Sequence, residues 1–203
     1  MPLRRCKLVV RQQPEVARAC GFGERDRRAV DPPPVVELEA IRGDGAVMNV
    51  EELHLAHFVV QASLWSEDGA ADMTTFLQPP RIAARRLLGS LAASPAVAAD
   101  EHNKKGAYFT FADLSCREAG RFRLKFTLAA IDPSNRTPGG NMPLLANVFS
   151  DIFTVYSPRD FPGMRRSTPL TQALKIQGVA IPARKGRNYP MPRQGEEGPS
   201  VTE

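Results

Sequence analysis

The segment at 121–131, RFRLKFTLAAI, alternates apolar with basic or polar residues from Arg121 to Leu128. Successive side chains of a β-strand point to opposite faces of a sheet, so the pattern predicts a strand with one buried and one solvated face. The buried face would carry Phe122, Leu124, Phe126 and Leu128. Such a face needs a second layer to cover it, which favours a packed β architecture.

Several other short segments show apolar alternation and end at Gly, Pro, Asn or Asp residues that are typical of turns. The chain of 203 residues also has 18 prolines and 15 glycines, which indicates many connections. The sequence therefore predicts a single all-β domain, an immunoglobulin-like antiparallel β-sandwich with one or two short helices. The further predicted strands are 7–11, 34–41, 57–65, 107–114, 147–157 and 178–184.

One helix is predicted near the C-terminus. Thr168 can cap it, Pro169 suits its first position and Gly178 can end it. The segment 79–94 is ambiguous, because its start favours a helix while Gly89 and the small residues after it suit a strand. We expect a folded domain over 1–187 and a disordered tail over 188–203, where apolar residues are scarce.

Positive charge gathers toward the two ends of the sequence. The net charge is +5 over residues 1–28, −4 over 29–158, +7 over 159–193 and −3 over the last ten residues. The total of +5 alone says little about a partner, since many proteins are mildly basic. The distribution indicates two cationic segments that flank an acidic middle.

The first cationic segment, ARACGFGERDRR, has two glycines and stands before three prolines at 32–34. A dinucleotide-binding loop is disfavoured, because Asp26 stands where the third glycine is needed and the prolines forbid the helix that should follow. Arginine suits phosphates and guanine edges. A loop at one end of a sandwich could therefore present its arginines to DNA, or it could be a solvated loop whose arginines pair with Glu15, Glu24 and Asp26.

Two smaller basic groups have open interpretations. Lys104 and Lys105 precede a predicted strand; we count them among the candidate DNA-binding residues because they could line a groove, and the alternative is a hairpin tip. Arg184 and Lys185, with Arg187, could join the first loop on one surface, serve as a nuclear import signal, or begin a solvated tail.

No enzyme site is indicated, and we expect no catalytic residue, metal or cofactor. Glu51, His54 and His57 recur every three residues, but leading into a strand they fit a polar edge better than a metal site. The three cysteines lack metal or disulfide spacing. Cys20 could be an activated thiol or a small packed residue. No membrane-spanning segment is expected.

Several blocks, among them ARACGFGERDRRAVDPPPVVEL, LLGSLAASP, FTFADLSCREAGRFRLKF and VFSDIFTVYSPRDFPGMRRSTPLTQALKIQG, occur in one order along the chain. In these blocks the sequence resembles the velvet family of fungal regulators from about Leu8 to Lys185, and it is most similar to the shorter members. Its connections at 43–56 and 132–144 need not match those of relatives in length.

The resemblance implies a Rel-like sandwich that binds double-stranded DNA as a homodimer or with another velvet protein. It also implies a regulator of development, sporulation and secondary metabolism that acts in the nucleus and can shuttle with the cytoplasm. The alternative is a nuclear adaptor that acts through another velvet protein with little DNA contact of its own. The positions that match the family's DNA-facing residues are Arg11, Arg18, Arg25, Arg27, Arg28, Arg184 and Lys185.

Overall fold

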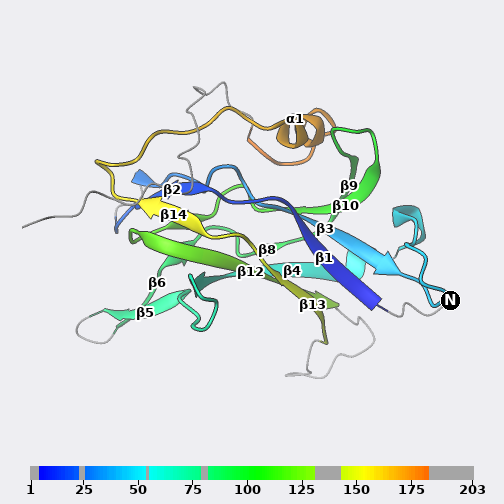
Figure 1. The fold of residues 1–203 in the computed structure, drawn as a ribbon, viewed down its shortest axis with the longest axis horizontal. Coiled ribbons are helices and arrows are strands. Elements are labelled where there is room, and N and C mark those ends of the chain that lie inside the picture. Colours follow the sequence, from blue (N-terminus) through cyan, green and yellow to red (C-terminus); the bar gives the residue numbers. More distant parts are fainter. Residues whose placement is uncertain (1–4, 23–25, 54, 79–81, 131–142, 183–203) are drawn as a thin grey trace, which may run out of the picture.

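Two β-sheets pack face to face and enclose the main hydrophobic core (Figure 1). The structure is a computed structural model and describes residues 5–22, 26–53, 55–78, 82–130 and 143–182. The first sheet has four antiparallel strands in the order β1, β3, β10, β9. Their bounds are Arg5–Gln12 (β1), Val35–Ile41 (β3), Ala96–Ala99 (β9) and Lys105–Thr110 (β10).

The second sheet has the order β2, β14, β12, β4, β8, and β13 also pairs with β12. Its pairs are antiparallel except for β2 and β14, which run parallel. The central β12 carries the two long pairings, with β4 and with β13. The bounds are Val16–Arg18 (β2), Phe58–Ser66 (β4), Ala92–Ala93 (β8), Gly120–Ala130 (β12), Leu144–Phe149 (β13) and Phe153–Tyr156 (β14).

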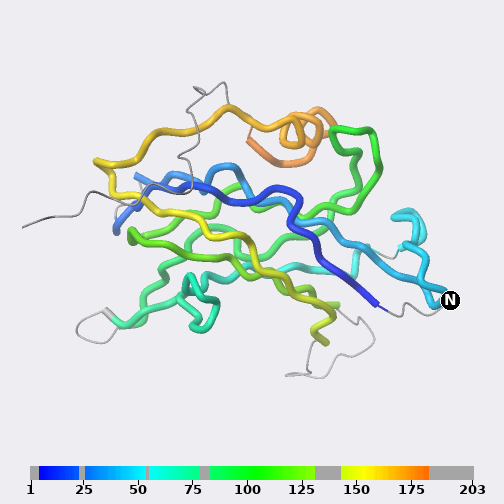
Figure 2. Tube along the Cα trace, in the orientation of Figure 1, coloured from blue at the N-terminus to red at the C-terminus, as the bar shows by residue number. Residues whose placement is uncertain are grey.

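Two small two-stranded sheets lie outside these layers. One is the hairpin of β5 (Thr75–Gln78) and β6 (Ile82–Arg85), and the other pairs β7 (Leu87–Leu88) with β11 (Ser115–Cys116). The tube in Figure 2 shows the β5–β6 hairpin at the same end of the long axis as the segment that follows β2. Short 3-10 turns occur at Val50–Glu52 and Leu55–His57.

The alternation in β12 has the predicted consequence. Phe122, Leu124, Phe126 and Leu128 are buried. Phe126 meets Phe111 across the core, with ring centroids 5.0 Å apart. The all-β sandwich is therefore confirmed, and the wet face of β12 carries the basic residues between them.

The predicted C-terminal helix is also confirmed, as α1 (Pro169–Ile176). The Thr168 side chain accepts a hydrogen bond from the Thr171 N–H, and Gly178 follows the helix with φ +86°. Leu170 and Leu174 pack with Tyr108 and Ile181 in a second, smaller cluster. Among the residues the structure describes, no helix is long and apolar enough to span a bilayer.

Some predicted strands are wrong in extent or in kind. The stretch 147–157 divides into β13 and β14, because the buried Ser150 turns its hydroxyl to the Leu124 N–H and interrupts the pairing. The stretch 107–114 forms a strand only to Thr110, and the ambiguous 79–94 forms β6, β7 and β8. No strand forms over residues 178–182, where the buried Ile181 packs against α1 instead. Residues 183 and 184 and the predicted tail lie outside the described residues.

Gly89, in the connection between β7 and β8, gives a test of stability. Its φ is +107°, and an added Cβ would meet the Asp113 carbonyl oxygen at 2.5 Å. We expect Gly89→Ala to lower the free energy of unfolding by about 2 to 3 kcal/mol, from backbone strain and the clash together. Gly45→Ala is the matched control, since Gly45 has φ +88° but nothing within 4 Å. Equal losses in chemical denaturation would show that the close approach to Asp113 contributes nothing.

Candidate nucleic-acid interface

The arginine loop, residues 18–28, leaves β2 at one end of the sandwich (Figure 1). Its first part is fixed by backbone hydrogen bonds: Cys20 N donates to Cys116 O and Gly21 N to Arg117 O, both at 3.0 Å. Its exit is fixed by the bond from Val30 N to Leu114 O at 2.7 Å. The three prolines that follow are buried, as expected of a rigid stop. The loop is therefore anchored on both sides to the chain around β11.

The arginines of this loop differ in how their charge is matched. Arg18 forms an ion pair with Asp26 inside the loop. Arg27 donates to two neutral acceptors, the Ser115 hydroxyl at 3.1 Å and the Asp113 carbonyl at 3.4 Å. Arg28 is exposed and has no side-chain partner within the described part of the chain. Two loop arginines thus keep positive charge that no described carboxylate balances.

Arg117 belongs to the same cationic end, although no pattern in the sequence pointed to it. Its Nε donates to the Arg85 carbonyl and its Nη1 to the Gly21 carbonyl, both at 2.8 Å. Carbonyl acceptors leave the guanidinium charge unneutralised. We call Arg27, Arg28 and Arg117 the free arginine group. A polyanion that approached this end would meet three cations without displacing an internal carboxylate from any of them.

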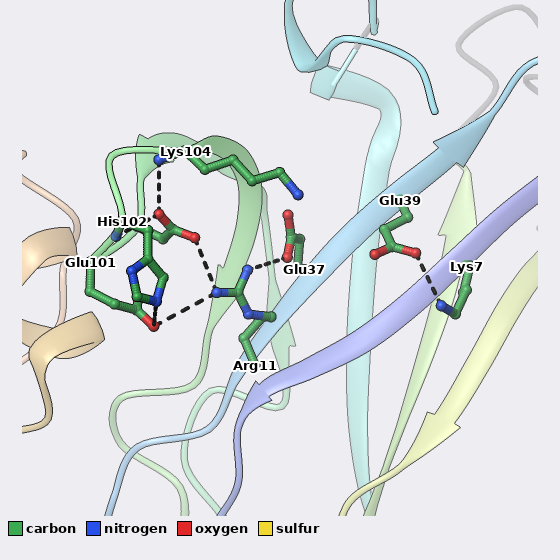
Figure 3. A network of polar contacts seen from close by, with 8 residues as sticks. Lys7, Arg11, Glu37, Glu39, Glu101, His102 and Lys104 are labelled. Carbon is green, nitrogen blue, oxygen red and sulfur yellow. Dashed lines mark hydrogen bonds and ion pairs between the residues drawn. The ribbon is translucent and has the colours of Figure 1, made fainter. Parts of the chain in front are cut away.

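Arg11 is in a different environment, the polar network of Figure 3. Its guanidinium bonds Glu37 at 2.6 Å and Asp100 at 3.1 Å, two carboxylates whose side chains are only 7% and 2% exposed. The hydrogen bond to Glu37 raises the pKa of Arg11 further. Burial opposes ionisation of Asp100, yet the bonds from Lys104 N, Arg11 and His102 N outweigh it and lower the Asp100 pKa. Arg11 therefore neutralises buried acids in this structure.

The predicted lysines lie with that network and away from the arginine loop. Lys104 and Lys105 lie where the β9–β10 turn enters β10, and Figure 1 places that turn toward the other end of the long axis. Lys105 forms an exposed ion pair with Glu51 at 2.7 Å. The structure brings Arg18, Arg27 and Arg28 together but not Arg11, Lys104 or Lys105. Arg25, Arg184 and Lys185 lie outside the described residues.

The residues that the sequence suggested for a metal site or a reactive thiol can be judged by their contacts and burial. Glu51 pairs with Lys105, and His54 is outside the described residues. Over the ranges that the structure describes, no group of three or more His, Cys, Asp or Glu residues could hold a metal ion. Burial raises the pKa of Cys116 to about 12, so it stays a thiol. Cys20 is buried too, at 5% exposure, which favours its interpretation as a packed residue.

Comparison with known proteins identifies the family. The family model described as velvet factor matches residues 6–84 and 77–188. The chain belongs to the velvet family. The resemblance seen in the sequence blocks is therefore confirmed.

Named velvet relatives are similar along most of the chain. The spore development regulator vosA of Beauveria bassiana is 45% identical over 97% of this chain and 71% of its own length. The sexual development regulator velC of Gibberella moniliformis is 46% identical over 91% of this chain, which spans only 40% of that protein. The velvet complex subunit 2 of Hypocrea jecorina is 26% identical. The first two are named as developmental regulators, and the third is named as a subunit of a velvet complex.

Proposed function

We propose that this velvet domain is a sequence-specific DNA-binding transcription regulator. The observation that carries the proposal is the free arginine group, in which Arg27, Arg28 and Arg117 meet no described carboxylate. The guanidinium fork matches phosphate oxygens and the O6 and N7 edge of guanine. Phosphate contacts would position the protein, and one or two arginines would read bases in the major groove.

The anchoring of the arginine loop supports this role. Backbone bonds from Cys20, Gly21 and Val30 to the chain around β11 hold the described residues on both sides of the loop. A loop held this way loses less conformational freedom on binding than a free one. Arg18 can contribute only if its pair with Asp26 opens, and we assign it a secondary part.

The regulated processes and partners are inferred from relatives. The vosA and velC relatives are named for spore and sexual development, and the Hypocrea relative is named as a velvet complex subunit. We therefore infer a role in fungal development and sporulation, as a homodimer or paired with another velvet protein. Control of secondary metabolism is proposed from the family resemblance of the sequence blocks. Because DNA is the target in this proposal, the protein would act in the nucleus. Arg184 and Lys185 would supply additional cations for DNA binding.

A second function, a nuclear adaptor that works through another velvet protein, is favoured by one observation. Of the cations predicted to face DNA, Arg11, Arg18 and Lys105 form ion pairs within the chain. Each of these pairs reduces the positive charge offered to DNA.

Duplex binding by the purified chain separates the two functions. The chain would be titrated into random and promoter duplexes, alone and with a velvet partner, at low and physiological salt. The DNA-binding proposal expects the chain alone to bind, more weakly at the higher salt. Binding that appears only when the partner is added would contradict it and support the adaptor.

A further inference from the structure

Four side chains form a column of ring and cation contacts that begins within the arginine loop. The Arg117 guanidinium lies 4.8 Å from the centroid of the Phe22 ring. Phe22 lies 6.4 Å from Phe76 between ring centroids, and the Arg86 guanidinium lies 4.9 Å from the centroid of Phe76. We call this set the Arg–Phe column. It joins the loop to the β5–β6 hairpin, whose Phe76 comes 54 residues after Phe22 in the sequence.

Hydrogen bonds fasten both arginines of the column to the backbone. Arg117 links the Gly21 carbonyl of the loop to the Arg85 carbonyl at the end of β6. Arg86 donates to the Met73 carbonyl before β5 at 2.7 Å and pairs with Glu118 at 2.7 Å. Hydrogen bonds therefore hold the hairpin both before β5 and at the end of β6. This gives Phe22 a fixed contact in Phe76.

Phe22 has a position that core packing does not explain. It is 57% exposed, and it follows Gly21, whose φ of +55° turns the chain at this point. A phenylalanine this exposed contributes little by burial. Its described ring contacts are with the Arg117 guanidinium and with the Phe76 ring, which is tilted by 51° against it.

We propose that Phe22 is a positioning residue for DNA binding. Through its contacts with Arg117 and Phe76, it holds the start of the arginine loop against the β5–β6 hairpin, so that the loop arginines are placed before the ligand arrives. A cation over an aromatic ring and an aromatic pair each stabilise such an arrangement modestly. Holding the loop beforehand removes part of the entropy that binding would otherwise cost. This inference rests on the proposed function, since it concerns the same loop.

The test is Phe22→Ala, which removes the stack without changing any charge. We expect duplex affinity to fall about tenfold, the equivalent of about 1.4 kcal/mol. The Phe22→Tyr variant keeps the stack and should restore wild-type affinity. Leu77→Ala, which truncates an apolar residue of the same hairpin that is 70% exposed, is the matched control and should bind as wild type. Wild-type affinity in Phe22→Ala, or a loss that tyrosine does not restore, would overturn the inference.

Amide hydrogen exchange of the free protein tests the loop without DNA. In Phe22→Ala, the Cys20 and Gly21 amides should exchange faster than in wild type, while Phe22→Tyr should match wild type. Unchanged exchange in Phe22→Ala overturns the positioning role even where DNA affinity falls. If the wild-type chain binds no duplex, the proposed function fails by itself, and faster exchange would still show that Phe22 holds the loop.

Discussion

Replacing Arg27 and Arg28 together by alanine is expected to weaken duplex DNA binding about a hundredfold. An arginine that contacts a base or a phosphate contributes about 1 to 3 kcal/mol to binding, and two such losses combine. Both side chains lie on the arginine loop, and neither meets a carboxylate among the described residues. The measurement is a binding titration with one labelled duplex at one fixed salt concentration.

The double variant Lys104→Ala, Lys105→Ala is the matched control for the loop variant. It also removes two positive charges, but from the turn that enters β10, away from the arginine loop. We expect its affinity to stay within about threefold of wild type, because only the long-range field changes and salt screens it. Equal losses in the two double variants would indicate that net charge, and not the loop, sets the affinity.

Arg11→Ala is expected to lower the free energy of unfolding by about 3 to 5 kcal/mol. Removing one partner of a buried ion pair leaves the other charge uncompensated in a place that water reaches poorly. Here two such charges would remain, since the Glu37 and Asp100 side chains are 7% and 2% exposed. Chemical denaturation of wild type and variant measures the difference.

The control for Arg11 is Arg42→Ala, which breaks an exposed pair with Glu52 of the same 2.6 Å length. That loss should stay below about 1 kcal/mol. The Arg11 effect should also depend on pH. The pKa of Asp100 is lowered by folding, so its contribution is present above its ordinary value of 3.8 and is lost as the pH falls through the lowered value. The difference in unfolding free energy between wild type and Arg11→Ala should therefore become smaller in acid. A difference that stays constant would contradict this account of the network.

Local pattern was sufficient for much of the fold. The period-two alternation of β12 and the capping signals at Thr168, Pro169 and Gly178 are properties of adjacent residues, and the structure confirms both elements. Strand ends were less predictable, because they depend on distant partners. Ser150 ends β13 by bonding Leu124, which lies 26 residues earlier. β2 is only three residues long and pairs in parallel with β14, so it leaves no periodic signal.

The positive charge of the candidate site could be predicted from the sequence, but which of its arginines form ion pairs could not. The arginine-rich loop is visible in the sequence, but which arginines are free depends on long-range contacts. Arg11 meets Asp100 across 89 positions, and Arg117 meets Gly21 across 96. Phe22, set between two glycines, was a local signal that could have been used, since an aromatic residue in a glycine-containing loop needs a partner. Its partner Phe76 follows only from the tertiary structure.

The salt dependence of duplex binding by the purified chain tests the central claim, direct DNA contact by the free arginine group, most directly. If the bound complex neutralises six or more phosphates, its affinity should fall about a thousandfold when the salt concentration is raised from 50 to 200 mM. In Arg27→Ala, Arg28→Ala the slope of log affinity against log salt should be shallower by about 0.9 for each phosphate contact removed. A wild-type slope near zero, or one that the loop variant leaves unchanged, would contradict the account.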